Sequence, residues 1–131
     1  MKDSSDYPAF TSHQLSGNIL HITLKKVKKL MAKDVEDIYE CFRLHGGDNG
    51  VFVIVSFSGF IPPSDDAMIE AKKQSNQKYV NAMVYVISSA APRLGVKFFM
   101  NFYKPKYSTD IFATQKQAMD WILKEKKKQG K

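Results

Sequence analysis

Hydrophobic residues follow an alternating or unbroken pattern in some segments of the chain and a helical spacing in others. Segment 9–24 holds two short strand-like runs joined by Ser16, Gly17 and Asn18, residue types that favour tight turns, so it predicts an antiparallel hairpin. The run VFVIVSF at 51–57 is almost continuously apolar and β-branched, which is typical of a central strand covered on both faces. Further strands are predicted at 82–87 and 108–113.

Four other segments have the spacing of helices. In segment 31–47 apolar residues recur every three or four positions, and two glycines end the pattern. Segment 64–77 is only weakly apolar and is expected to lie loosely on the sheet. Segment 88–105 is rich in aromatic residues. Segment 114–123 opens with the Thr-x-x-Gln pattern of a capping box, and its apolar face ends near residue 123.

The order of these elements predicts the fold class. A hairpin followed by alternating helices and strands implies an α/β fold with a mixed, mainly parallel sheet of about five strands, backed by helices. Residues 1–131 suit one domain with one core, since a chain of this length buries roughly two-thirds of its unfolded surface. Segment 25–30, KKVKKL, is interpreted as a strand edge guarded by lysines. A phosphate or lipid-headgroup site is the alternative, which we rank lower.

Composition narrows the setting in which the protein works. The longest apolar runs fall well short of the ~20 residues that span a bilayer, and residues 1–10 contain no apolar stretch of the signal-peptide type. The single cysteine, Cys41, cannot form an internal disulfide. These observations predict a cytoplasmic protein.

The positive charge is concentrated in one place. The formal net charge is +7, and residues 124–131 hold five lysines and one glutamate, so they contribute +4 and the rest of the chain +3. The chain has only two arginines, Arg43 and Arg93, although arginine is the residue best suited to phosphate and base recognition. We therefore interpret 124–131 as a solvated, frayed helix end and rank nucleic acid and anionic membranes low as partners.

The inventory of acid–base groups is small. His13 and His21 fall on the opening strands and His45 at a helix end, and none has a second ligand-type residue at metal-binding spacing. Cys41 flanks the apolar stripe of its helix, so we interpret it as a small buried hydrophobic residue. We expect no catalytic residues, no metal and no cofactor.

Several segments together resemble the bacterial STAS/SpoIIAA-like proteins, and a small uncharacterised branch of them in particular. They are GNILHITLKK, VFVIVSF, NAMVYVI and, above all, FFMNFYKPKYSTDIFATQKQAMDWI. In that branch an aromatic helix leads through Lys-Pro to a strand ending in phenylalanine, and a helix with Ala-x-x-Trp closes the domain. The corresponding residues here are Lys104, Pro105, Phe112, Ala118 and Trp121. The resemblance covers roughly residues 10–123 and implies a four- or five-stranded sheet in a domain of a kind that usually binds partner proteins and sometimes nucleotides or small ligands.

The resemblance also directs attention to the connector after the central strand. In the sporulation regulators of this fold, a serine at the start of the following helix is phosphorylated to break a partner contact. The matching candidates are Ser58 and Ser64, with Asp65 beside them. The family motif places Asp before Ser near a glycine, whereas here Ser64 precedes two acids and follows two prolines. We therefore interpret Ser64 first as a helix cap and second as a switch.

The aromatic helix leaves two interpretations open. Its rings fill the core or a homodimer interface, or they line a pocket against the sheet for a small apolar ligand or lipid, as in the related CRAL-TRIO/Sec14 proteins. The candidate residues are Phe98, Phe99, Met100, Phe102 and Tyr103. We expect a non-enzymatic, homodimeric regulatory or protein-interaction module, with a carrier of a small apolar ligand or lipid as the alternative.

Overall fold

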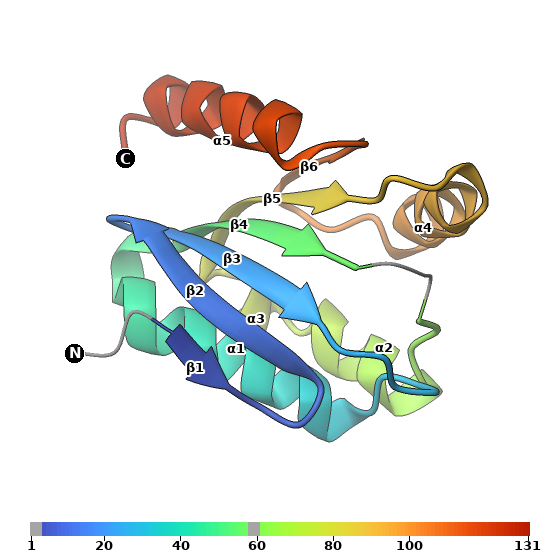
Figure 1. Cartoon of the computed structure of the whole chain (residues 1–131). Coiled ribbons are helices and arrows are strands. Elements are labelled where there is room, and N and C mark those ends of the chain that lie inside the picture. The colour runs from blue at the N-terminus through green and yellow to red at the C-terminus, as the bar shows by residue number, and fades with distance from the viewer. Residues whose placement is uncertain (1–3, 58–60) are drawn as a thin grey trace.

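One sheet runs through the molecule, and its strands are arranged in the order in which they occur along the chain (Figure 1). The computed structural model describes residues 4–57 and 61–131, including the backbone but not the side chains of Gln74, Ala91, Phe98, Phe99, Phe102 and Tyr103. Within that part of the chain the sheet has six strands: β1 (Ser4–Asp6), β2 (Phe10–Ser16), β3 (Ile19–Leu24), β4 (Val51–Ser56), β5 (Val80–Val86) and β6 (Ser108–Phe112).

The sheet is mixed. Strands β1, β2 and β3 pair antiparallel, and β3, β4, β5 and β6 pair parallel. Each parallel pair needs a crossover, and helices supply it. The expected α/β class and the mainly parallel sheet with alternating helices are therefore confirmed.

Helices lie on both faces of the sheet. On one face are α1 (Ala32–Gly46), followed by the 3-10 turn η1 (Gly47–Asn49), and then α2 (Asp65–Lys72) and the short α3 (Gln74–Gln77). On the other face lies α5 (Gln115–Gln129), and α4 (Ala90–Tyr103) stands beyond the carboxyl ends of β4 and β5 (Figure 1). Among the described residues, no helix has both the length and the apolar character needed to cross a bilayer.

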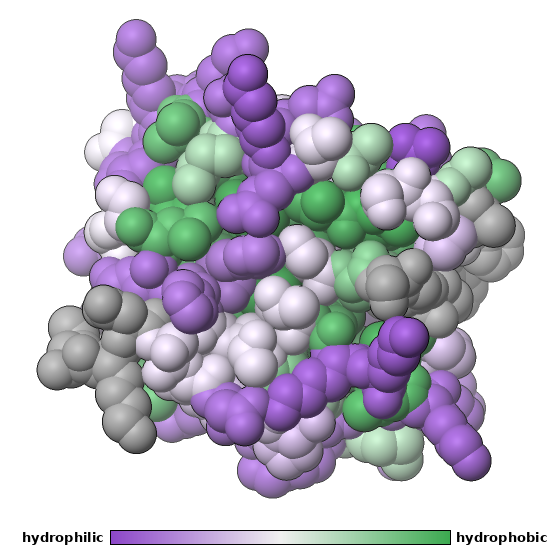
Figure 2. All heavy atoms as spheres, in the orientation of Figure 1, coloured by the Kyte–Doolittle hydropathy of each residue, from purple (hydrophilic) through white to green (hydrophobic). Residues whose placement is uncertain are grey.

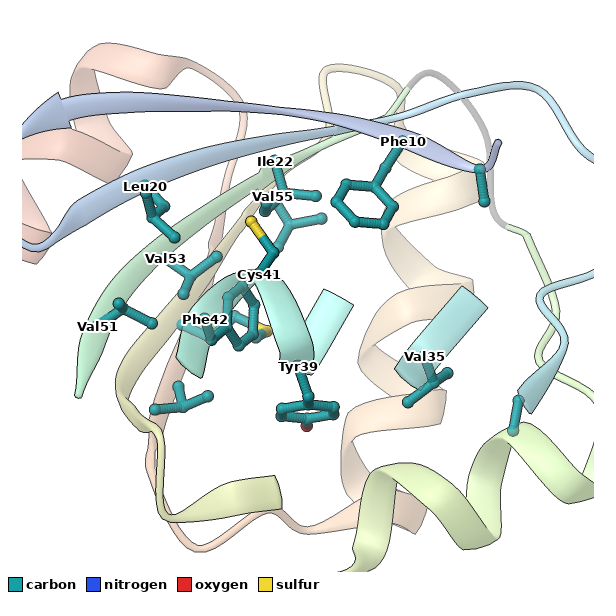
Figure 3. Packing of buried hydrophobic residues seen from close by; sticks show 14 residues of the cluster. Phe10, Leu20, Ile22, Val35, Tyr39, Cys41, Phe42, Val51, Val53 and Val55 are labelled. Atoms are coloured by element: carbon teal, nitrogen blue, oxygen red, sulfur yellow. The ribbon is translucent and has the colours of Figure 1, made fainter. Parts of the chain in front are cut away.

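The central strand β4 contributes to two apolar layers. Val51, Val53 and Val55 pack towards α1, where Phe42 is fully buried (Figure 3). Phe52 and Ile54 pack on the opposite side against α5. Because successive strand residues point to opposite faces, an unbroken apolar run suits a strand covered on both sides. Fully burying such a side chain contributes roughly 1.5–3 kcal/mol.

Three details differ from the expectations. A sixth strand, β1, pairs with β2 through Ser4–Asp6, which are polar and therefore gave no hydrophobic signal. The strand predicted within KKVKKL is wrong, since residues 25–29 form an irregular connector between β3 and α1. The last helix does not fray near residue 123 but continues to Gln129. Lysine, glutamate and glutamine are good helix formers, and Gly130, with φ of 71°, caps the end.

Candidate functional site

The connector between β4 and α2 is held against the segment that precedes α1. The N–H of Leu30 donates to the carbonyl of Pro62 at 3.0 Å, and the N–H of Ser64 donates to the carbonyl of Leu30 at 2.8 Å. The two prolines favour an extended backbone, which can pair in this way. As a result, the amino ends of α1 and α2 lie next to each other at one corner of the molecule.

Ser64 is the N-cap of α2. Its Oγ accepts the backbone N–H of Ala67 at 3.0 Å, and the residue is only 9% exposed. Asp65 and Asp66 follow in the first turn, exposed to solvent, where the helix dipole favours negative charge. A phosphoryl group on Ser64 would have to leave this buried position and give up the cap. Ser58, the other serine candidate of the connector, lies outside the described residues.

Exposed apolar side chains lie on the two elements that meet at this corner. Met31, which precedes α1, is 51% exposed, and Ile69, in the second turn of α2, is 63% exposed. Lys28 and Lys29 supply positive charge on the segment between β3 and α1, whereas Asp65 and Asp66 supply negative charge on α2. We name the group Met31, Asp65, Asp66 and Ile69, with Lys28 and Lys29, the corner surface. It combines apolar side chains with charges of both signs, as the centre and rim of protein interfaces do.

A second constellation lies on the opposite face of the sheet. His21 on β3 is half-buried, and its Nε2 lies 2.7 Å from Oγ of Ser56 at the end of β4. His13 faces His21 across the β2–β3 pair. Burial, and then the charge of His13, lower the pKa of His21 from its ordinary value of 6.5, so the imidazole is neutral near pH 7. This face of the strands is turned towards the viewer in Figure 2, where apolar side chains gather beneath α5.

The pair His21–Ser56 does not by itself make a nucleophilic site. A catalytic serine needs a base that is oriented by a third group and a donor for the developing oxyanion. In the hydrogen-bond network of the described residues, His21 bonds to Ser56 and to no carboxylate. The arrangement supports a neutral, half-buried hydrogen bond that joins β3 to β4.

The metal-ligating and nucleophilic side chains of the described residues do not gather at one place in the structure. Within residues 4–57 and 61–131, no three His, Cys, Asp or Glu side chains come together as a metal site. Cys41 is fully buried, and burial raises the pKa of its thiol, so the reactive thiolate is disfavoured. Nδ1 of His45 lies 2.9 Å from the carbonyl oxygen of Cys41, near the end of α1. The interpretation of Cys41 as a small buried hydrophobic residue is confirmed.

An apolar cavity of about 110 Å³ lies between the sheet and helices α1 and α2. The helices contribute Val35, Ile38, Tyr39, Phe42 and Ala71, and the sheet side contributes Ile22, Leu24, Val55, Met83, Tyr85 and Tyr107. None of the described side chains of the aromatic helix, for which the sequence suggested a pocket, lines this cavity. Met100 on α4 is partly buried, and the side chains of Phe98, Phe99, Phe102 and Tyr103 lie outside the described set. The pocket predicted there stays a prediction.

Sequence reasoning missed two of these features for an identifiable reason. Ser56 ends a strand whose other residues are apolar, and its partner His21 is 35 positions away, so no local spacing linked them. Tyr85 and Tyr107 come from β5 and from the loop before β6, and only the parallel pairing of these strands brings them together. Tyrosine is common in and near strands, so neither residue indicated a cavity in the sequence.

The chain matches proteins whose roles are themselves undetermined. Residues 13–126 match a domain of unknown function, DUF7793. No curated protein matches the chain. The fold is similar to that of an uncharacterised protein from the DUF3478 family of Shewanella loihica PV-4, whose crystal structure has a SpoIIAA-like fold. That structure has a TM-score of 0.62 and 14% identity, covering 87% of this chain and 92% of its own. At this identity the likeness concerns the fold alone, and it confirms the expected SpoIIAA-like architecture.

Proposed function

The chain belongs to the DUF7793 family of domains of unknown function, and we propose that it is a non-enzymatic interaction module that pairs with a second copy of itself through the corner surface. The observation that carries the proposal is the exposure of Met31 (51%) and Ile69 (63%) beside a connector fixed by backbone hydrogen bonds. Large apolar side chains held on a rigid frame lose little entropy on association. The SpoIIAA-like fold supports an interaction role by analogy only.

The charges of the corner surface favour a copy of the same chain as the partner. A two-fold interface places the same residues on both sides, so it needs charges of both signs within one patch. Lys28 and Lys29 precede α1, and Asp65 and Asp66 begin α2. Rotation by two-fold symmetry can bring the lysines of one copy to the acids of the other while Met31 and Ile69 meet between them.

Sedimentation over a range of protein concentrations tests the proposal. The wild type is expected to show a monomer–dimer equilibrium, and the double variant Met31→Asp/Ile69→Asp is expected to be monomeric with an unchanged circular dichroism spectrum. Leu44→Asp is the matched control, because Leu44 is an equally exposed apolar residue (64%) at the other end of α1. A monomeric wild type, or equal dimerisation of the double variant and the wild type, would refute the role of the corner surface.

A further inference from the structure

A basic hollow of about 440 Å³ opens at the amino ends of β5 and β6, away from the corner surface. Lys78, Lys106 and Lys131 line it together with uncharged side chains, and none of the described lining residues carries a carboxylate side chain. Three cations with no acidic side chain among the described residues of the same wall produce a local positive potential. Such a hollow attracts an anion.

Hydrogen bonds hold the walls of this hollow in place. Oε1 of Gln77 accepts the backbone N–H of Lys106 at 3.1 Å, which fixes the loop before β6 against α3. Asn81 on β5 donates to the carbonyl of Asn49 at 2.9 Å and accepts from Nζ of Lys131 at 3.0 Å. Lys106 and Lys131 are therefore brought to the same hollow by segments that are far apart in sequence.

Tyr107 borders both the basic hollow and the apolar cavity. It lines both, and it follows Lys106 directly in the chain. Its hydroxyl lies 4.0 Å from Sδ of Met83, so the ring reaches the wall of the apolar cavity. The wall of an apolar space and the wall of a cationic space thus share one side chain. A ligand that fills both must have an apolar part and an anionic part within one small molecule.

We propose that this site binds a single-chain anionic amphiphile, with its carboxylate or phosphate head at Lys78, Lys106 and Lys131 and its tail in the apolar cavity beyond Tyr107. A cavity of about 110 Å³ is close to the ~150 Å³ that accommodates a benzene-sized molecule. The buried part of the tail is therefore short. Lysine binds either head group as a point charge, so the two heads share one recognition chemistry. The proposal is independent of self-association through the corner surface.

Titration of the full chain with octanoate and with octyl phosphate tests this proposal. The methyl resonance of Met83 reports the tail, and calorimetry at two salt concentrations reports the head. Saturable binding of both probes, with the Met83 methyl shifted and the affinity lowered by salt, is the expected result. The uncharged octanol and the cationic octyltrimethylammonium are expected to bind at least tenfold more weakly. Equal binding of octanol would refute the role of the lysines.

Two pairs of variants separate the head from the tail. Lys78→Gln/Lys106→Gln is expected to weaken octanoate and octyl phosphate about five- to tenfold, because two charge-assisted contacts are lost. Lys26→Gln/Lys124→Gln, which removes two exposed lysines outside both the hollow and the corner surface, is expected to leave the affinity for both probes unchanged. Ala71→Leu narrows the cavity and is expected to abolish the Met83 shift, whereas Ala90→Leu, at an exposed position in the first turn of α4, is the control. Thermal unfolding confirms that each variant is folded.

Three further binding results would also support or overturn the amphiphile proposal. Inorganic phosphate that binds as tightly as octyl phosphate, without shifting Met83, would show that the hollow is a plain phosphate site and would overturn the proposal. Binding that survives both Lys78→Gln/Lys106→Gln and Ala71→Leu would place the amphiphile elsewhere. A preference for octyl phosphate over octanoate, lost in the lysine variant, would support the site and identify a phosphate head as the better fit.

Discussion

Replacing Ser64 by alanine removes the side-chain acceptor that caps α2. The bond from the N–H of Ala67 to Oγ of Ser64 is 3.0 Å long, and Ala67 is fully buried. Without the hydroxyl, the N–H of Ala67 loses the acceptor that Ser64 provided. Because Ala67 is buried, water cannot easily replace that acceptor. Loss of an N-cap lowers the free energy of unfolding by about 0.5–2 kcal/mol. Because this cap is buried, we expect Ser64→Ala to lower it by about 1–2 kcal/mol.

The chain contains its own controls for this experiment. Ser89 is the N-cap residue of α4 but makes no side-chain capping bond, so Ser89→Ala is expected to change stability by less than about 0.5 kcal/mol. Thr114 caps α5 through the N–H of Gln117 at 3.2 Å in a more exposed setting, and Thr114→Ala is expected to fall between the two.

Urea unfolding followed by far-ultraviolet circular dichroism measures all three variants. The midpoint for Ser64→Ala should fall while the slope with urea stays constant, and the melting temperature should fall by roughly 3–6 °C. If Ser64→Ala and Ser89→Ala were equally stable, the capping bond would contribute nothing. The interpretation of the Ser-Asp-Asp segment as a cap would then lose its physical basis.

Two other predictions concern buried titratable groups. The pKa of His21 is lowered from 6.5, so the unfolded chain binds its proton more tightly, and the stability that neutral His21 contributes above pH 6.5 should be lost as the pH falls below that value. His21→Gln should flatten that part of the profile in urea unfolding, and an unaltered profile would mean that other groups cause it. Burial raises the pKa of the Cys41 thiol, so a thiol reagent should label native protein only through unfolding. Labelling in 4 M urea should accelerate in step with loss of helical signal, and rapid labelling of native protein at pH 8 would show that Cys41 is accessible.

The sequence was a good guide to elements that bury a continuous apolar run. Segment 51–57 predicted a strand covered on both sides, and β4 is such a strand because both faces of the sheet carry helices. The capping box that begins at Thr114 was also predicted correctly from the sequence, because it depends only on residues close together in the chain. The edge strand β1 was missed because its residues are polar and its pairing with β2 depends on backbone hydrogen bonds. Hydrophobic periodicity carries no information about such a strand.

The candidate sites were less predictable because they depend on long-range pairing. The cap at Ser64 is local, so the sequence alone could propose it. Met31 and Ile69 belong to different helices, and only the pairing of Leu30 with Pro63 brings the starts of these helices together. The lysines at 78, 106 and 131 come from three segments, and the sequence drew attention to the last of them only as part of a basic tail.

The order of strands in the sheet has a consequence for how the chain acquires its structure during synthesis. Each strand from β2 onward pairs with the strand made just before it, so the sheet can grow at one edge as the chain emerges from the ribosome. Helix α5 is made after all of these strands, however, and it covers Phe52, Ile54 and Val84. A nascent or truncated chain that ends near residue 114 therefore has a complete sheet with one apolar face open to water. Synthesis and docking of the 15-residue helix α5 is the step that removes this aggregation-prone surface.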